Sequence, residues 1–282
     1  MAADTVHITW NGVELSNEGP FIVEMLTGWE DLPSPRVSDI PRANAHGSFD
    51  APVWAGARTV VAEGHCNTPE TRDALLQTLG RAIVHTAAPA ELAIAFAGRE
   101  LTAAARLTRS GRTLRDWGVG CFGFQIEWWA PDPFRYGEAV STSTGLPDDP
   151  GGLQFPLFNT GGALQFGDLG VPGQVTLYND GTAEAWPTFT VTGPVPTGFE
   201  IREVATGARV RWAGTVPGGI PVVIESRTGT ASYGGAPGYE GHIVRREWAP
   251  VPPAGASTFQ FLGLGSRDPA ALLTASIRAT YW

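Results

Sequence analysis

Residues 179–194 read Asn-Asp-Gly-Thr-Ala-Glu-Ala-Trp-Pro-Thr-Phe-Thr-Val-Thr-Gly-Pro, and this stretch decides the fold class. Asn179-Asp180-Gly181 offers the positive φ angles of a tight turn. Three threonines then alternate with Phe189 and Val191, which is the pattern of a half-buried strand. A turn followed by such a strand predicts the edge of a β-sandwich.

The same pattern recurs downstream of this stretch. Residues 201–204 predict a strand, Ala205-Thr206-Gly207 a turn, and residues 210–212 the returning strand. Further strands are expected at 221–225, 242–248, 258–262 and 275–282. The second half of the chain is therefore predicted to be all β.

Composition agrees with a turn-rich β protein. The 282 residues suggest about two domains. The chain contains 36 glycines and 23 prolines, which favour turns, and its hydrophobic content of 43% supplies enough apolar surface for folded cores. The formal net charge of −9 disfavours binding to the phosphates of nucleic acid, and no apolar run is long enough for a membrane span or a signal peptide.

The first half of the chain predicts strands and one helix. Apolar residues alternate on both sides of Asn11-Gly12, which predicts a two-residue hairpin turn. Residues 60–64, 92–96, 101–107 and 119–128 are also expected to be strands. Between them, a helix over 69–83 is predicted from Pro69 in its first turn and leucines at helical spacing.

Two segments lack any regular pattern. Residues 27–47 contain three prolines together with Arg36 and Arg42, and we expect a long loop that contacts a partner or is simply solvated. Residues 138–155 are rich in Ser, Thr, Gly, Pro and Asp, which predicts a linker. The expected domains are thus 1–137 and 156–282.

Short motifs follow one another along the chain. In the second half they are Gly151-Gly152-Leu153-Gln154-Phe155-Pro156, Trp186-Pro187-Thr188-Phe189 and Thr206-Gly207. Taken in order, these motifs resemble the C-terminal half of the siphophage distal tail protein family, whose members are also called minor tail or tail-component proteins. Residues 128–137, which read Trp-Trp-Ala-Pro-Asp-Pro-Phe-Arg-Tyr-Gly, are similar to the segment that closes its N-terminal domain, and His46-Gly47 with residues 56–64 to the middle of that domain.

The resemblance implies a mostly β fold, with an N-terminal β-rich belt domain that carries one α-helix, followed by a galectin-like β-sandwich. It implies a structural virion protein at the distal end of a long non-contractile tail, a homohexameric ring with a channel for DNA. The implied partners are the tail tube protein, a tail tip, tail-associated or fibre protein, and the tape measure protein. Synthesis and assembly would take place in the host cytoplasm.

Interface candidates are Arg36, Arg42 and His46 in the long loop, and Trp129. Adjacent strand residues face opposite sides, so one ring of Trp128-Trp129 is expected to meet another element or a neighbouring subunit. Arg245-Arg246 splits in the same way, and one of these guanidinium groups could pair with carboxylates at an interface or remain solvated.

An alternative function is a carbohydrate-binding module that recognises a host-surface glycan. Tyr233 and Tyr239 lie in the Gly-rich segment 229–241, where sugar rings could stack on them, although the same aromatic residues could instead fill the sandwich core. A glycosidase would need two carboxylates across a sugar ring. Candidates for that pair are Glu200, Glu203, Glu225 and Glu240.

The sequence offers no further catalytic or metal-binding motif. The five histidines never occur at HExxH or CxxC…H spacing, and His65-Cys66 is more typical of packing than of zinc binding. Cys66 and Cys121 are expected to be buried thiols. We therefore expect neither cofactor, metal ion nor enzymatic activity.

Overall fold

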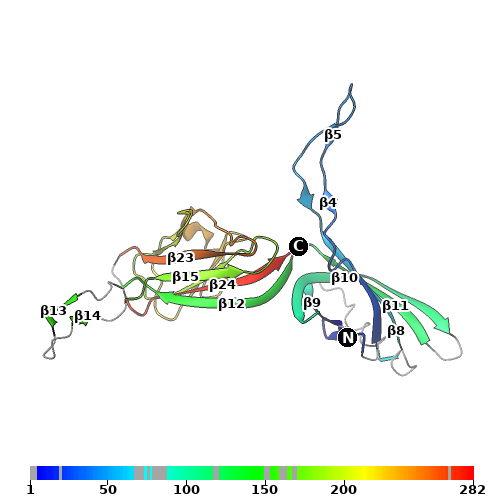
Figure 1. The fold of residues 1–282 in the computed structure, drawn as a ribbon, viewed down its shortest axis with the longest axis horizontal. Helices are drawn as coiled ribbons and strands as arrows, with labels where there is room; N and C mark the ends of the chain where they lie inside the picture. Colours follow the sequence, from blue (N-terminus) through cyan, green and yellow to red (C-terminus); the bar gives the residue numbers. More distant parts are fainter. Residues whose placement is uncertain are drawn as a thin grey trace. The chain divides into compact units, whose positions relative to one another are not determined.

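The computed structural model describes residues 5–18, 21–66, 73, 74, 77, 88–116, 121–148, 153–158, 164–166, 170–265 and 268–282. The chain divides into two compact units, Met1–Glu138 together with Tyr281–Trp282, and Ala139–Thr280. The described residues are almost entirely strands and connecting loops (Figure 1), which confirms the predicted mostly β fold class.

A sheet that closes on itself forms the body of the first unit. Its strands are β1 (His7–Trp10), β2 (Val13–Ser16), β3 (Phe21–Thr27), β8 (Arg58–Cys66), β9 (Ala90–Phe96), β10 (Arg99–Asp116) and β11 (Cys121–Ala130). They pair in the order β11-β8-β3-β2-β1-β9-β10, and β10 also pairs with β11. Because β10 has β9 on one edge and β11 on the other, the ladder is continuous around a barrel.

Two tryptophans fill the interior of this barrel. Trp10 on β1 and Trp128 on β11 are both buried, and their ring centroids lie 6.4 Å apart in an edge-to-face arrangement. The indole N–H of Trp10 donates to the carbonyl oxygen of Ala105 on β10, at 3.2 Å. Asn11 and Gly12 take φ angles of 47° and 76°, which confirms the predicted hairpin turn between β1 and β2.

The predicted helix over 69–83 lies largely outside the described residues. Asp73, Ala74 and Gln77, which are described, are helical. Cys66 is buried at the end of β8, as expected, whereas the side chain of Cys121 is outside the described part.

The second unit is a β-sandwich. One sheet has the order β12-β24-β16-β19-β20-β21 and the other β15-β23-β17-β18-β22. The strands of the first sheet are β12 (Arg135–Gly145), β16 (Thr188–Thr192), β19 (Val222–Glu225), β20 (Thr230–Tyr233), β21 (Ala236–Pro237) and β24 (Leu272–Tyr281). Those of the second are β15 (Gln174–Asn179), β17 (Phe199–Glu203), β18 (Arg209–Trp212), β22 (Ile243–Arg246) and β23 (Gly255–Gly263). A short hairpin, β13 (Leu153–Phe158) with β14 (Leu164–Phe166), precedes β15.

Phenylalanines from both sheets meet in the sandwich core. Phe189 on β16 contacts Phe259 on β23 edge to face at 5.1 Å, and Phe199 packs against Phe261 and Trp212. β16 pairs with β24 on one side and with β19 on the other, so the predicted edge position of this strand is wrong. The alternation of residues 188–192 reports one buried face, and it carries no information about how many strand edges are paired.

The turn at Asn179-Asp180-Gly181 also differs from the prediction. None of the three residues takes a positive φ. Instead, a Cβ on Gly181 would lie 2.0 Å from the carbonyl oxygen of Thr280, so close backbone approach is what requires glycine here. The buried Asn179 amide donates to the carbonyl oxygens of Ala183, Val251 and Pro252 and accepts from the backbone N–H of Gly181 and Thr280.

Part of the predicted linker is regular structure. Residues 138–145 form the second part of β12. Of the side chains at 138–143, five are exposed and one is half-buried, so this part shows no alternation between a buried and an exposed face. Exposed Ser and Thr residues resemble a linker in composition, and only backbone pairing reveals the strand.

Candidate functional site

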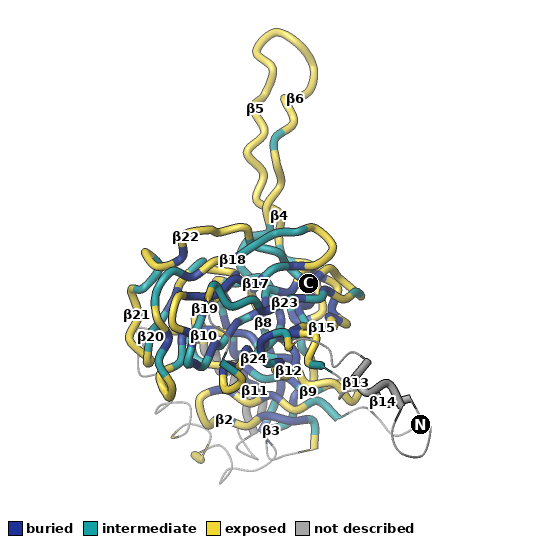
Figure 2. Tube along the Cα trace, turned by 90° about the vertical axis from the view of Figure 1, so that its left-hand side faces the viewer, coloured by how far each residue is buried: buried dark blue, intermediate teal, exposed yellow. Residues whose placement is uncertain are grey.

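A long hairpin arm leaves the barrel between β3 and β8. We define the arm as residues 30–56. Its two legs pair at β4 (Pro35–Arg36) with β7 (Trp54–Ala55), and farther out at β5 (Ile40–Pro41) with β6 (Ser48–Phe49). Where the sequence predicts a loop over 27–47, the structure therefore has one leg of a two-stranded ribbon. Figure 2 shows this ribbon exposed along nearly its whole length.

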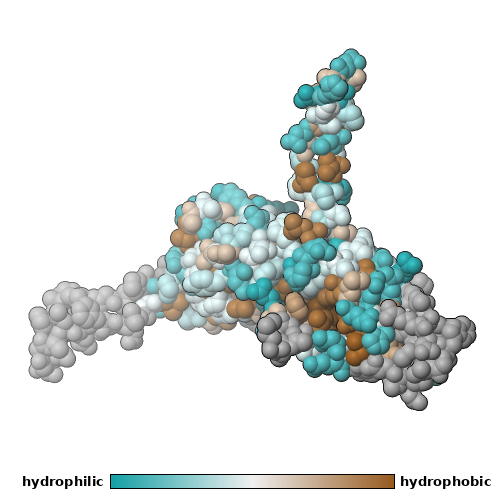
Figure 3. Space-filling view, turned by 45° about the vertical axis from the view of Figure 1, so that its right-hand side comes forward, coloured by the Kyte–Doolittle hydropathy of each residue, from teal (hydrophilic) through white to brown (hydrophobic). Residues whose placement is uncertain are grey.

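Large apolar side chains lie exposed on this arm, where Figure 3 shows a group of brown atoms. They are Leu32 (77% exposed), Ile40 (66%), Trp54 (63%), Phe49 (60%), Val53 (58%) and Val37 (48%). Isolated exposed apolar residues are ordinary, but a projecting ribbon with six of them has no core of its own to cover them. Such a ribbon is typical of a surface that another protein covers.

The arm is fixed at its base by a buried arginine. Arg58, at the start of β8, is 1% exposed. Its Nη1 donates to the carbonyl oxygens of Gly28, Trp29 and Asp31 at 2.8, 2.8 and 2.7 Å, and its Nε donates to that of Pro133 at 2.9 Å. Burial and the neighbouring charge of Arg135 lower the pKa of Arg58 to about 10, so this guanidinium stays charged at neutral pH.

A second arginine completes the base. Arg135, at the start of β12, is paired through Nη1 with Glu30 at 2.6 Å and lies 5.6 Å from the centroid of the Trp29 ring. Arg135 also donates to the backbone carbonyl oxygen of Trp282, whose ring packs on Phe134 with centroids 4.5 Å apart. The two arginines therefore hold the base of the arm in place, and this fixes the direction in which the ribbon leaves the barrel.

Neither arginine was among the sequence candidates, although a signal was present. Arg58, Val60 and Ala62 are every second residue of β8, so their side chains lie on the same, buried face of the strand. A charged residue on the buried face of a strand needs partners, and here those partners are four backbone carbonyls.

Three of the four interface candidates lie on the arm. Arg36 lies exposed on β4, Arg42 stacks over the Phe49 ring at 5.3 Å, and His46 lies exposed in the turn at the end of the arm. Trp129 instead lies on the outer side of β11, half-buried under the Arg106 guanidinium, which is 5.4 Å from its ring centroid. Trp128 is the ring that faces the barrel core.

The two possible glycan contacts lie next to each other. The ring centroids of Tyr233 and Tyr239 lie 5.4 Å apart, and the Tyr239 ring also stacks on the His242 ring at 5.8 Å. The His242 ring in turn stacks on the buried Trp212 at 5.0 Å. Both tyrosines pack against the sandwich core. Much of their ring surface is therefore covered by other rings.

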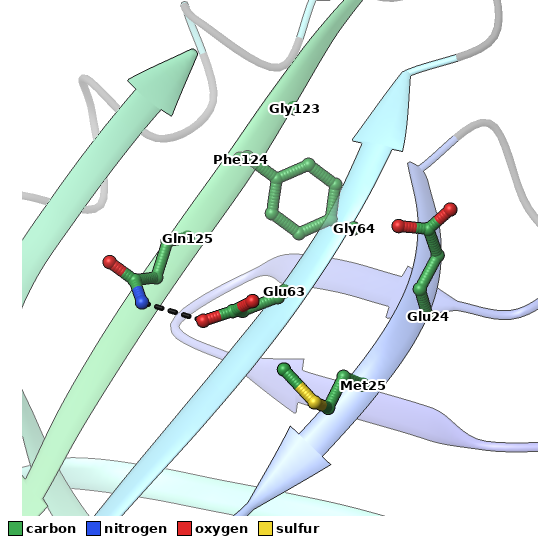
Figure 4. Close-up of a pocket in the computed structure, with 7 residues that line it drawn as sticks. All are labelled: Glu24, Met25, Glu63, Gly64, Gly123, Phe124 and Gln125. Carbon is green, nitrogen blue, oxygen red and sulfur yellow. Dashed lines mark hydrogen bonds between the residues drawn. The ribbon is translucent and has the colours of Figure 1, made fainter.

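A hollow of about 480 Å³ opens on the barrel wall, as Figure 4 shows. It is lined by Gly64 and Gly123 and bordered by Glu24, Glu63 and Gln125. Gln125 donates to Glu63 at 2.7 Å, and His65 Nδ1 lies 3.0 Å from Glu24. These polar groups satisfy one another, so the hollow presents no reactive arrangement.

The carboxylates considered for glycosidase chemistry are each engaged locally. Glu203 accepts from the backbone and hydroxyl of Thr206, Glu240 from the backbone N–H of Ala231, and Glu225 from Thr188. Glu200 faces Arg209 at 3.7 Å. Across the described ranges there is no group of three metal-ligating side chains. No helix in the same part of the chain has the length and hydropathy to cross a membrane.

Solved structures similar to the whole chain come from phage tails. Dit (gp 19.1) of phage SPP1, described as a paradigm of the hub adsorption apparatus in phages infecting Gram-positive hosts, matches with a TM-score of 0.67 and 12% identity, over 98% of this chain and 99% of that one. A chain of the phage P2 baseplate in its activated conformation matches with a TM-score of 0.50 and 10% identity, over 92% and 98% of the two chains. The chain has the fold of a phage distal tail protein. The predicted resemblance to distal tail proteins is thereby confirmed in the fold, whereas no protein-family model and no curated protein matches the sequence itself.

Proposed function

We propose that this protein is a structural component of a phage virion, a ring-shaped hub at the distal end of a long non-contractile tail. It joins the tail tube protein to the baseplate, tip or fibre proteins and leaves a channel for DNA. The observation that carries the proposal is the anchored, apolar, solvent-exposed arm on a chain with the distal tail fold.

An arm that leaves one copy and lies on the next makes a heterologous contact, and such contacts close into a ring when the rotation between copies is right. We infer a homohexamer. In that ring the apolar side chains of the arm are buried against a neighbouring copy, with Arg36, Arg42 and His46 at the same contact and Trp129 on the barrel wall. The tape measure protein is a further candidate partner.

The remaining properties fit a scaffold. A net charge of −9 would let DNA pass without strong binding, since phosphate binding needs a surplus of positive charge. The role requires no cofactor, no catalysis, no sequence-specific DNA contact and no insertion into a membrane. Assembly in the host cytoplasm before release in the virion belongs to the same proposal.

The test is the mass of the purified full-length protein by light scattering, with negative-stain images of the same fraction. The proposal predicts closed rings with a central channel, and the double variant Ile40→Ser/Trp54→Ser should shift the mass toward the monomer. Val140→Ser/Val244→Ser is the matched control, because these side chains are 63% and 60% exposed but lie on the sandwich.

Two outcomes would count against the hub. One is a monomer at every concentration, both alone and when mixed with the phage's own tail tube protein. The other is a ring that the arm variant leaves intact, which would remove the arm from the ring contact.

A further inference from the structure

The outer face of one sandwich sheet carries a concentration of arginines. Three adjacent strands, β17, β18 and β22, hold Arg202, Arg209, Arg211, Arg245 and Arg246. The chain as a whole is acidic, with a net charge of −9. Positive charge is therefore gathered on this sheet against the overall balance of the protein.

Strand register places four of these side chains side by side on the solvent face. Phe199, Ile201, Val210 and Trp212 are buried, so the residues that alternate with them point outward. Arg202 pairs in register with Arg209, and Arg211 pairs with Glu200 on one side and with Arg245 on the other. Directly opposed residues have Cβ atoms about 5 Å apart, so the guanidinium groups can reach one ligand together.

Only part of this charge is compensated within the protein. Arg209 lies 3.7 Å from Glu200, and Arg245 lies 2.7 Å from Glu247. Arg202 and Arg211 make no hydrogen bond and no ion pair to any residue that the structure describes. Two guanidinium forks, each able to bind a carboxylate or phosphate with two parallel hydrogen bonds, therefore remain available.

Amide and hydroxyl groups continue the same face toward the other edge of the sheet. Gln174 on β15 pairs with Gln260 on β23, which pairs with Arg202, which in turn pairs with Arg209. This row runs amide, amide, guanidinium, guanidinium across four strands. Thr176 and Thr258 form the next row, and Tyr178 follows on β15 with 74% of its surface exposed.

The opposite sheet of the sandwich shows that this pattern is not a general property of its surface. On β16 and β24 most outward positions are hydroxyl-bearing side chains, namely Thr188, Thr190, Thr192, Thr274 and Ser276, and Arg278 is the charged one among them. Solubility is met on these two strands almost entirely with neutral groups. The arginine-bearing sheet therefore has a surplus of charge that solvation does not explain.

We propose that the outer face of the sheet β15-β23-β17-β18-β22 binds an acidic polysaccharide. Arg202 and Arg211 bind the acidic groups, and the glutamine row hydrogen-bonds sugar hydroxyls. The exposed Tyr178 ring offers an apolar surface to the C–H face of a sugar. An acidic peptide would use the arginines alone, whereas a saccharide uses all three kinds of group. This site differs from the tyrosine pair Tyr233–Tyr239 and goes beyond the tail-hub proposal.

The proposal is tested by calorimetric titration of the full-length protein with polygalacturonate, alginate, hyaluronan and heparin fragments. At least one should bind, with an affinity that falls as salt is raised, because the contacts are exposed charges. The methyl ester of polygalacturonate keeps the sugar and removes the charge, whereas poly-L-glutamate keeps the charge and removes the sugar. Both should bind at least about tenfold more weakly than the acidic saccharide that binds.

Matched variants locate the site. Arg202→Gln/Arg211→Gln should weaken saccharide binding about tenfold or more, while Arg227→Gln/Arg278→Gln, which removes the same charge elsewhere on the sandwich, should change it less than threefold. Circular dichroism and thermal unfolding confirm that both variants fold. Binding to none of the four polymers, equal binding of poly-L-glutamate, or equal effects of the two double variants would each overturn the assignment. Ring mass is measured on the same samples, so failure here is separate from failure of the hub.

Discussion

Nη1 of Arg58 lies 2.8 Å from the carbonyl oxygen of Trp29, and this contact joins the barrel to the residue that precedes the hairpin arm. The same nitrogen also donates to the carbonyl oxygens of Gly28 and Asp31, so one buried cation binds three backbone carbonyl groups within residues 28–31. Every residue carries a backbone carbonyl, so substitutions at residues 28, 29 and 31 leave these acceptors in place. The anchor therefore depends on the side chain of Arg58 alone.

We expect Arg58→Met to lower the free energy of unfolding of the first unit by about 3 kcal/mol, because four backbone carbonyl groups at the base of the arm lose the buried donor that they share. Arg58→Lys should be intermediate, since an ammonium group lacks the planar fork that reaches both Pro133 and the arm. Urea unfolding monitored by tryptophan fluorescence measures both, and limited proteolysis should cut the arm sooner in both variants. Wild-type stability in Arg58→Met would show that water replaces the guanidinium.

In the second unit, the corresponding polar centre is Asn179. Asn179→Ala should destabilise the sandwich by about 2–3 kcal/mol, because five hydrogen bonds of a buried amide are lost. Asn179→Asp should cost at least as much, because a carboxylate cannot donate to the carbonyl oxygens of Ala183, Val251 and Pro252. Tyr178→Ala, one residue earlier and exposed, is the control for chemical denaturation. An aspartate variant as stable as the wild type would refute the donor role.

Local turn chemistry predicted the turns at Asn11-Gly12 and Ala205-Thr206-Gly207 correctly, though not the conformation at Asn179-Asp180-Gly181. Asn11-Gly12 specifies its hairpin because both residues must take positive φ, and Gly207, at 75°, does the same between β17 and β18. These signals depend only on neighbouring residues. The closing of the barrel, by contrast, depends on the pairing of β10 with both β9 and β11, which no local pattern encodes.

The candidate site could be predicted only in outline. Residues 27–47 stood out because they lack a period, and the structure explains that lack: an exposed ribbon has no buried face to impose one. The pairing of this segment with residues 48–55 gave no signal for the same reason. Arg58 was overlooked because its acceptors are backbone groups, which leave no trace in the side-chain sequence.

Glu203 predicts a pH dependence of the sandwich. Burial opposes ionisation of its carboxylate, but the hydrogen bonds from Thr206 outweigh burial and lower its pKa below the ordinary 4.5. A carboxyl whose pKa is lower in the folded state stabilises above the unfolded pKa, and that contribution disappears as pH falls through the folded pKa.

Glu203→Gln should therefore reduce the free energy of unfolding by about 1 kcal/mol at pH 7, and the difference from the wild type should shrink below about pH 4.5. Thermal unfolding at pH 7, 5, 4 and 3 measures this. The exposed Glu184→Gln serves as control. A difference that stays constant from pH 7 to pH 3 would mean that the hydrogen-bond geometry, and not the charge, stabilises the turn.

Gly181 gives the sharpest test of the sandwich geometry. A Cβ at this position would lie 2.0 Å from the carbonyl oxygen and 2.6 Å from the amide nitrogen of Thr280. This backbone is held by the N–H of Ala183, which donates to the Thr280 carbonyl oxygen, and by the Asn179 side chain, which accepts from the Thr280 N–H. We expect Gly181→Ala to cost about 3 kcal/mol. Gly218→Ala is the matched control, because a Cβ there meets nothing within 4 Å, and reduced freedom of the unfolded chain should make it neutral or stabilising by up to about 1 kcal/mol. Equal melting temperatures for the two variants would mean that the chain around Gly181 and Thr280 is farther apart than the structure places it.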